Sequence, residues 1–344
     1  MTFVKFFCRL KNIHFKFYLM KKILVKLPLA GVVAAALLFS SVFLSCTKND
    51  SGYGGGVSSN YASTALKITD AAIDDAAVQG AFVTITDIQL DGQSVQGFNK
   101  TTVDLAAYQN GSTKTLGNFN LQGKTYTSIT FVLDFATDAS GNFPGCYVLN
   151  NSGVKSQLTS NSNIVTVTKG FSLVAGASNS IVADFDLRKL IIHQSGGSDH
   201  YNFVTSAEMQ GAVRLVVENQ TGTISGTLTD AVSGSGKVIV YAYKKGAFVR
   251  SQEVQGQGSS NIEFKNAVSS AVVNGSGYYQ LHFLESGEYE LHFAKYTDAN
   301  ADGEFDLTGT LIIIGAGTID PLNIVVSSGL TLSLNATATG VLSL

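Results

Sequence analysis

The sequence predicts an all-β protein with two consecutive antiparallel β-sandwich domains after an N-terminal leader. Short runs of β-branched and aromatic residues, separated by turn signals rich in Gly, Asn and Ser, recur from Leu66 to the C-terminus. Segments with a sustained 3.6-residue apolar period are missing, which argues against an α/β fold. Many short strands at this spacing are typical of sandwiches.

The leader has the composition of a secretory signal. Residues 1–45 hold seven of the 23 Lys and Arg residues and no acidic residue, and an apolar run from Leu27 ends at Cys46. The sequence FLSC (43–46) resembles the bacterial lipobox, in which the Cys is lipidated and becomes the first mature residue. Met20, followed by two lysines, resembles a natural start, so residues 1–19 are interpreted as a possible mis-called start.

An uncleaved membrane anchor is the alternative for this leader, because about 18 apolar residues can span a bilayer. The small residues before Cys46 and the absence of a basic stop-transfer cluster favour cleavage and lipidation. Residues 46–62 then form a flexible, Gly-rich tether. Lys48-Asn49-Asp50 partly resembles the export signal of surface lipoproteins in Bacteroidetes. We expect a lipid anchor in the outer membrane that holds the domains at the cell surface. The periplasmic side of that membrane is the alternative.

The net charge argues against a nucleic-acid-binding protein, and the cysteine content argues against a disulfide-stabilised one. Without the leader, 16 basic residues remain against all 25 acidic ones, a net charge of −9, and they form no basic run. Nucleic-acid binding is therefore not expected. Cys8 lies in the leader and Cys46 takes lipid, so Cys146 cannot form an internal disulfide. We expect Cys146 to be a buried thiol.

The strands of both domains follow from the apolar runs. For the first domain, 63–218, we expect strands at 65–70, 80–90, 102–107, 115–119, 128–135, 146–149, 164–167, 180–192 and 203–218, with a helical turn at 71–78. For the second domain, 219–344, we expect strands at 223–228, 237–243, 277–283, 288–294, 311–314, 322–326 and 330–335. The segments 277–283 and 288–294 alternate apolar with polar residues and predict a hairpin with one buried face.

Two resemblances add to this interpretation. ALKITDAAIDD (65–75), GAFVTITDIQL (80–90) and ADFDL (183–187) resemble a family of unknown function in Bacteroidetes lipoproteins, over about residues 63–218. That resemblance implies an immunoglobulin-like sandwich and no assigned activity. ISGTL (224–228), GYYQL (277–281) and SGEYEL (286–291) resemble the carboxypeptidase-regulatory-like, transthyretin-type domain. This second resemblance implies a non-catalytic accessory sandwich.

One loop has the spacing of a cation site. Asp298, Asn300 and Asp302 alternate before Gly303, as in the first half of an EF-hand, although position twelve holds Gly309 instead of Glu. The loop resembles shorter calcium loops of extracellular sandwiches. Asp298, Asn300, Asp302 and Asp306 would supply side-chain oxygens and Glu304 its carbonyl. The sequence thus predicts a weak structural calcium site, with an ion-free acidic turn as the alternative.

Other polar groups give weaker signals. His282 and His292 would face each other on the wet side of the predicted hairpin, but two histidines without a third ligand favour ordinary exposed residues. Asp184, Asp186 and Arg188 share one face of a strand, which we expect to be a solvated charged face and not a glycosidase pair. Asp70, Asp74 and Asp75 are interpreted as turn and capping residues, with cation binding as the alternative.

No catalytic motif emerges, so we expect a non-enzymatic envelope lipoprotein that binds or scaffolds at the surface. Its partners would be the membrane, through the anchor, and a glycan or protein ligand. A pilus or adhesin subunit is the alternative. Fimbrial precursors are generally cleaved after an Arg early in the chain, however, and the first Arg after Cys46 is Arg188. A polysaccharide hydrolase that uses loop carboxylates is the third hypothesis.

Overall fold

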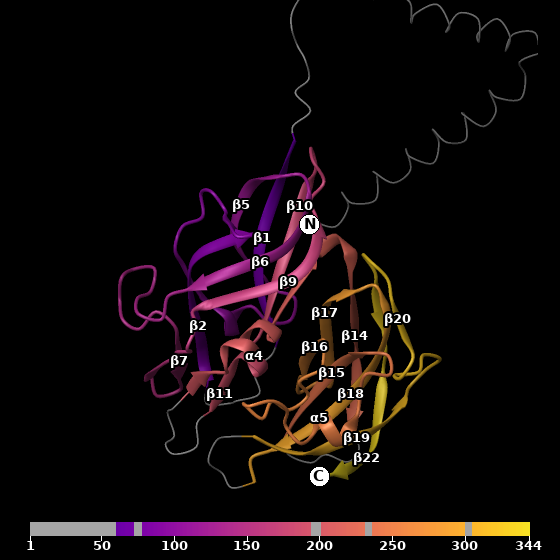
Figure 1. The fold of residues 1–344 in the computed structure, drawn as a ribbon. Helices are drawn as coiled ribbons and strands as arrows, with labels where there is room; N and C mark the ends of the chain where they lie inside the picture. The colour runs from indigo at the N-terminus through magenta and orange to yellow at the C-terminus, as the bar shows by residue number, and fades with distance from the viewer. Residues whose placement is uncertain (1–59, 72–77, 194–200, 231–235, 300–304) are drawn as a thin grey trace, which may run out of the picture. The chain divides into compact units, whose positions relative to one another are not determined.

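The computed structural model describes residues 60–71, 78–193, 201–230, 236–299 and 305–344. Residues 58–344 form one compact unit. Strands make up most of the described chain, which confirms the predicted all-β class. Figure 1 shows two groups of strands, here called the N-terminal lobe (60–217) and the C-terminal lobe (221–343). The predicted boundary near residue 219 falls at η2 (Glu218–Gln220), and two separately folding domains stay a prediction.

The N-terminal lobe contains two large sheets. The four-stranded sheet has the order β13 (Val213–Val217), β10 (Ser178–Asp186), β1 (Tyr61–Ala71) and β5 (Lys114–Gln122). The larger sheet has the order β8 (Lys155–Gln157), β7 (Tyr147–Asn150), β2 (Val78–Leu90), β6 (Thr125–Leu133) and β9 (Ile164–Ser172), with β3 (Gln93–Ser94) and β4 (Thr101–Asp104) beside β2. η1 (Leu105–Ala107) follows β4. Most pairs are antiparallel, but β1 and β10 are parallel.

Period-2 alternation explains how these strands enclose a core. In β2, Val83, Ile85 and Ile88 are fully buried, and a register shift between Ile85 and Asp87 changes the phase between them. Apolar residues from both sheets form one continuous cluster. Cys146 is completely buried in this cluster, as predicted.

Two segments predicted as long strands are interrupted by helices. The segment 180–192 consists of β10, the helical turn α3 (Leu187–Leu190) and β11 (Ile191–His193). The segment 203–218 contains the end of β12 (Tyr201–Phe203), then α4 (Ser206–Gly211) and β13. Thr205 and Glu208 form a capping box at the start of α4, and this Thr-x-x-Glu spacing favours a helix where a strand was predicted.

The C-terminal lobe is one curled nine-stranded sheet. Its main order is β16 (Ser269–Val273), β15 (Lys237–Lys244), β18 (Gly287–Thr297), β19 (Asp306–Gly315), β22 (Ala336–Ser343), β14 (Thr221–Asp230) and β17 (Tyr278–Glu285). β20 (Ile324–Val326) pairs with β18, and β21 (Thr331–Ser333) pairs with β14. The strands enclose a second apolar cluster.

The predicted hairpin in this lobe is wrong. β17 pairs with β14, whereas β18 pairs with β15, β19 and β20, so the chain between them crosses to another part of the sheet. Alternation identifies the buried face of a strand but not its neighbour, and both pairings satisfy it. Phe283 also breaks the expected alternation: its φ is +55°, and Leu284 is fully buried in its place.

A segment between β15 and β16 packs against both lobes. It contains α5 (Arg250–Glu253) and the loop that follows. Phe264 packs with Tyr241 over the outer face of β15, whereas Ile262 belongs to the core of the N-terminal lobe. Ile262 and Phe264 are only two positions apart, yet their side chains pack in different lobes.

Candidate binding cleft

Only part of the predicted calcium loop lies within the described residues. Asp298 and Asp306 are described, and Asp306 pairs with Thr297 where β19 begins. Asn300, Asp302 and Glu304 lie outside the described residues. Elsewhere in the described chain, His, Cys, Asp and Glu form no group of three that could hold a metal ion. Calcium binding by this loop stays a prediction.

The predicted leader, tether and lipidation residue Cys46 also lie outside the described residues. Within the described ranges, none of the helices is long and apolar enough to cross a membrane. The lipid anchor stays a prediction.

The two histidines do not meet, because the strands that carry them do not pair. His282 packs on Gly111 of the N-terminal lobe, so closely that a Cβ at Gly111 would lie 2.5 Å from the imidazole ring. His292 stacks on Phe248 with 3.6 Å between ring centroids. Burial lowers the pKa of both imidazoles. Neither histidine is an exposed strand residue as predicted, and they do not form a common metal site.

The expected solvated face at Asp184, Asp186 and Arg188 is instead a buried ion-pair network. Asp184 and Asp186 are 5% and 6% exposed. Arg188 Nη2 lies 2.8 Å from Asp186 Oδ2, and Arg214 Nη2 lies 2.5 Å from Asp184 Oδ2. Lys189 Nζ adds a contact of 3.2 Å to Asp186. Period-2 spacing placed the two carboxylates on one face correctly but could not show that the C-terminal lobe covers it.

The cations of this network also donate to backbone carbonyls of the C-terminal lobe. Arg188 Nη1 donates to Glu263 O at 2.7 Å and to Phe264 O at 3.2 Å. Lys189 Nζ donates to Ala267 O at 2.5 Å. In the same way, Arg214 Nη1 donates to the carbonyl of Phe283. Hydrogen bonds from charged donors are among the stronger ones in proteins, so the network holds the two lobes against each other.

Asp70 lies inside β1 and is buried, and is not a turn residue as expected. Its Oδ1 accepts from the backbone N–H of Leu187, the first residue of α3. Burial raises the pKa of Asp70 well above its usual value, and the charges of Asp186 and Asp184 raise it further. Asp74 and Asp75 lie outside the described residues. Asp70, Asp184 and His282 line a cavity of about 20 Å³, which has room for one water molecule.

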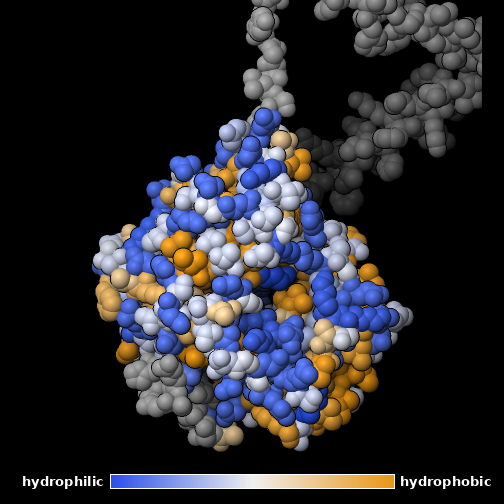
Figure 2. All heavy atoms as spheres, viewed as in Figure 1, coloured by the Kyte–Doolittle hydropathy of each residue, from blue (hydrophilic) through white to orange (hydrophobic). Residues whose placement is uncertain are grey.

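A larger cleft opens beside the network. It has a volume of about 400 Å³ and lies between β9, β10, the end of α4 and β13 on one side and residues 265–268 on the other. We call it the interlobe cleft. Figure 2 shows a hollow, bordered mainly by hydrophilic residues, where strands of the two lobes meet on this face. Ligand sites prefer such positions between two packed bodies, at volumes of about 300–1,000 Å³.

Cations outnumber carboxylates around the interlobe cleft. Its charged lining residues are Lys169, Lys189, Arg214 and Lys265, against Asp184 and Asp186. Lys169 is held by Glu285 at 2.6 Å and by Leu215 O at 2.8 Å. Val167, Val213 and Val268 are apolar lining residues on the same segments as these cations. The cleft thus combines cationic and apolar lining residues.

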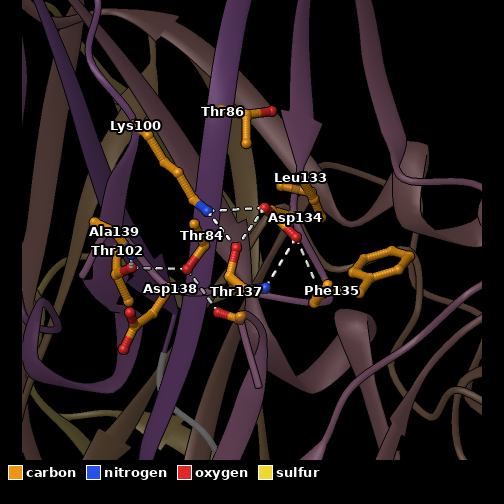
Figure 3. A network of polar contacts seen from close by, with 12 residues as sticks. Thr84, Thr86, Lys100, Thr102, Leu133, Asp134, Phe135, Thr137, Asp138 and Ala139 are labelled. Carbon is orange, nitrogen blue, oxygen red and sulfur yellow. Dashed lines mark hydrogen bonds and ion pairs between the residues drawn. The ribbon is translucent and has the colours of Figure 1, made fainter. Parts of the chain in front are cut away.

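A separate polar network organises the loop after β6 (Figure 3). Asp134 Oδ2 accepts from Lys100 Nζ at 2.8 Å and from Thr137 Oγ1 at 3.1 Å, while its Oδ1 accepts from the backbone N–H groups of Ala136 and Thr137. The Lys100 ammonium and these donors outweigh partial burial and lower the pKa of Asp134 to about 2. A carboxylate with all these partners serves to fix the loop.

The ordered loop presents an aromatic ring to solvent. Thr84 Oγ1 donates to Gly145 O at 2.6 Å, and Ala139 N donates to Thr102 Oγ1 at 2.8 Å, which ties both ends of the loop to the sheet. Phe143 lies between these ties and is 68% exposed. We treat this loop as a secondary surface.

The basic residues that line the cleft were not predicted from the sequence. Arg214 stands alone in the apolar run VRLVV, and a single cation inside a strand of this kind signals a buried ion pair. Lys169 and Lys265 carry no comparable signal. They approach Arg214 only because β9, β13 and the loop after α5 converge.

Comparison with solved structures finds similar chains of low identity. The Bacillus anthracis TIE protein is 13% identical, with a TM-score of 0.18; the match covers 81% of this chain and 34% of that one. A major pilin subunit of Bacillus cereus is 12% identical, with a TM-score of 0.21 and coverages of 81% and 70%. The minor pilin of Streptococcus agalactiae is 10% identical, with a TM-score of 0.20 and coverages of 82% and 98%. Likeness at this level assigns neither a function nor an assembly.

Curated protein sequences give no significant match to this chain. A family model does match part of it. That part includes most of the N-terminal lobe, from β1 to the residue after β12, and stops before Arg214 and the C-terminal lobe. Residues 62–204 match the family described as a domain of unknown function (DUF4382), which agrees with the resemblance seen in the sequence.

Proposed function

We propose that the chain is a non-catalytic lipoprotein of the cell envelope, anchored through Cys46, that binds a ligand in the interlobe cleft. The observation that carries the binding role is the cleft itself, about 400 Å³ in volume and lined by four cationic side chains. The anchor rests on the sequence FLSC at 43–46. An anchored sandwich pair with a fixed cleft suits capture of a ligand at the cell surface.

The state of the carboxylates supports binding over hydrolysis. Glycoside hydrolysis needs two carboxyl groups beside the substrate, one of them held protonated. Asp186 stays ionised, because Arg188 and Lys189 outweigh its burial and lower its pKa. Asp70 has a raised pKa, but the cavity beside it has room for one water and not for a sugar ring.

Rigidity of the cleft is the second support. Arg188, Lys189 and Arg214 belong to the N-terminal lobe, and all three donate to carbonyls of the C-terminal lobe. These contacts fix the distance between the walls of the cleft. A preformed site loses less conformational freedom on binding than a flexible one.

The test uses the full mature chain on an array of bacterial, plant and mucin polysaccharides. Gly211 lines the cleft, and a Cβ added there would meet no atom within 4 Å, so Gly211→Leu obstructs the cleft without a clash. Gly275→Leu is the matched control, because Gly275 is equally open but lies outside the cleft. We expect binding to be lost in Gly211→Leu and kept in Gly275→Leu. Binding that survives Gly211→Leu contradicts the proposed site.

The anchor is tested separately. Cells that express the chain with radiolabelled palmitate should label the parent protein and not Cys46→Ser, and the variant should leave the membrane fraction. Protease added to intact cells should degrade the parent if the lobes face outward. Labelling of Cys46→Ser equal to the parent would remove the lipoprotein assignment.

A further inference from the structure

We infer that the C-terminal lobe docks on an anionic lipid bilayer through an exposed aliphatic patch. The patch consists of Ile312 and Ile314 of β19, Leu342 of β22, and Leu322 in the loop before β20. This inference rests on the proposed lipid anchor and adds a second contact with the same membrane. Three features carry it: an uncovered sheet face, its basic border, and the predicted tether to Cys46.

The outer face of the C-terminal sheet is covered over β15 and β18 but open over part of β19. The segment around Phe264 buries this face of β15 and β18. On β19 the cover ends near Thr310, whose hydroxyl accepts from Arg250 Nε at 2.9 Å. Ile312 and Ile314 follow on the same face by period-2 spacing and are 43% and 55% exposed.

Leu342 and Leu322 extend this open face to both sides. β22 pairs with β19 in a register that places Gly340 opposite Ile312, with Leu342 two residues further along. The Ile312 side chain leans over Gly340, since a Cβ there would lie 3.1 Å from its Cδ1. On the other side, Ile314 and Leu322 line one groove of about 400 Å³. Figure 2 shows hydrophobic residues gathered on the part of the lobe that carries β19 and β22.

Exposed aliphatic residues are concentrated at this end of the chain. Of the fourteen large hydrophobic residues that are well exposed among the described residues, seven lie within 312–344. Single exposed apolar residues are ordinary, whereas a contiguous group marks an interaction surface. All seven are Ile, Leu or Val. Protein interfaces are enriched in aromatic residues, Met and Arg, so this composition favours a lipid partner.

Two cations border the patch and match an anionic lipid. Lys245 Nζ donates to Asn323 Oδ1 at 2.6 Å, one residue beyond the groove. Arg250 Nη2 donates to the carbonyl of Leu342 at 2.8 Å. Against them, the groove lining contributes the carboxylate of Asp320. Charges more than about 8 Å away are largely screened at physiological salt, so these local charges outweigh the negative charge of the whole chain.

The predicted tether keeps the patch within reach of the bilayer. Residues 46–59 separate the lipidation residue from the first described residue. Fully extended, such a segment spans about 50 Å, and its Gly-rich composition gives a root-mean-square length of about 20 Å. A lobe held at this range meets the membrane at millimolar effective concentration. Weak docking through a few aliphatic side chains is therefore sufficient.

The experiment is an equilibrium titration of the full mature chain with phosphatidylglycerol and phosphatidylethanolamine vesicles, at millimolar lipid. Leu322→Cys carries an environment-sensitive dye, in a Cys46→Ser background that takes no lipid. Ile164→Cys is the matched control, because Ile164 is similarly exposed on β9. We expect a blue shift at position 322 and none at position 164. Ile314→Thr should weaken binding about fivefold, and the similarly exposed Val154→Thr should leave it unchanged.

Lipid charge and self-association are tested with the same chain. Lys245→Gln should weaken binding to these vesicles about fivefold. Binding that depends neither on Lys245 nor on lipid charge overturns the choice of an anionic lipid. Sedimentation without vesicles should give a monomer. A dimer that Ile314→Thr dissociates overturns the membrane contact and identifies a second copy as the occupant.

The anchor and the docking fail separately. Docking of this strength does not hold an unanchored chain through washing, so Cys46→Ser still leaves a washed membrane fraction. Palmitate on Cys46 without a blue shift at position 322, or with equal shifts at 322 and 164, overturns the docking and leaves the anchor. A blue shift at position 322 alone, without palmitate on Cys46, overturns the anchor and supports the docking.

Discussion

Replacing Arg188 with Met tests whether the buried ion pairs hold the lobes together. The Arg188 side chain is 4% exposed, bonds Asp186 and two carbonyls of the C-terminal lobe, and lies over the Tyr241 ring at 5.1 Å. Met keeps most of the volume and removes every charged contact. Asp186 then keeps the ion pair with Lys189.

The expected loss is large because the partner groups stay buried. Breaking a buried ion pair from one side costs about 3–5 kcal/mol, since an uncompensated charge remains. Removing Asp186 as well, in Arg188→Met with Asp186→Leu, removes that charge but leaves the Lys189 ammonium with the Ala267 carbonyl as its partner. The double variant should therefore recover about half of the loss.

Urea unfolding of the full chain, followed by circular dichroism, measures both variants and the Asp186→Leu single variant. Limited proteolysis of the segment 254–267 reports whether the lobes separate before they unfold. We expect the single variants to expose this segment and the double variant to protect it more. A loss below about 1 kcal/mol in Arg188→Met would refute the reasoning, because a solvated surface pair has that value.

Four further results are expected. Asp70→Asn should raise stability at pH 7 and not at pH 3, because the folded carboxyl with its raised pKa keeps a proton that the unfolded chain loses near pH 4. Asp134→Asn should cost about 1 kcal/mol at pH 7 and nothing at pH 2, since its pKa of about 2 gives stability that is lost as pH falls from 3.8 to 2. Cys146 should resist iodoacetamide at pH 8 in the folded chain, because burial raises its pKa to about 12. Calcium should give heat with the parent and none with Asp298→Ala plus Asp302→Ala.

Each of these predictions has a control and a result that would contradict it. The stability variants are compared by thermal unfolding across pH, and Lys100→Met should reproduce the pH dependence of Asp134→Asn. A less stable Asp70→Asn at pH 7 would mean that the carboxylate is needed at that site. Cys146 labelling in guanidinium shows that the reagent is active, and rapid labelling of the folded chain contradicts the burial. Identical calcium traces remove the calcium site.

Local pattern was enough to predict the class of the fold and the burial of single residues. Alternation located most strands of both lobes, and it placed Asp184 and Asp186 on one side of β10. It also marked Cys146 as a buried thiol. These properties depend on residues within one strand, which is the range over which the period of apolar residues carries information.

The cleft depends on contacts between segments far apart in the chain. Whether Asp186 faces water or Arg188 depends on what covers β10, and that cover is the segment around Phe264. The pairing of β17 with β14 also depends on segments far apart in the chain, because the alternation within β17 is equally compatible with a hairpin to β18. Asp184, Asp186 and Arg188 could therefore be named from the sequence, but Lys189 and Arg214, and the cover over these charges, could not.

The position of Ile262 sets an order of events during synthesis. This residue fills the core of the N-terminal lobe, although the chain enters the C-terminal lobe about 40 residues earlier, at β14. A chain is synthesised from its N-terminus, so the first lobe lacks part of its interior until the loop after α5 has been made. The lobe that is made first is then completed by a later segment, and a chain truncated before Ile262 would leave that core open to proteases.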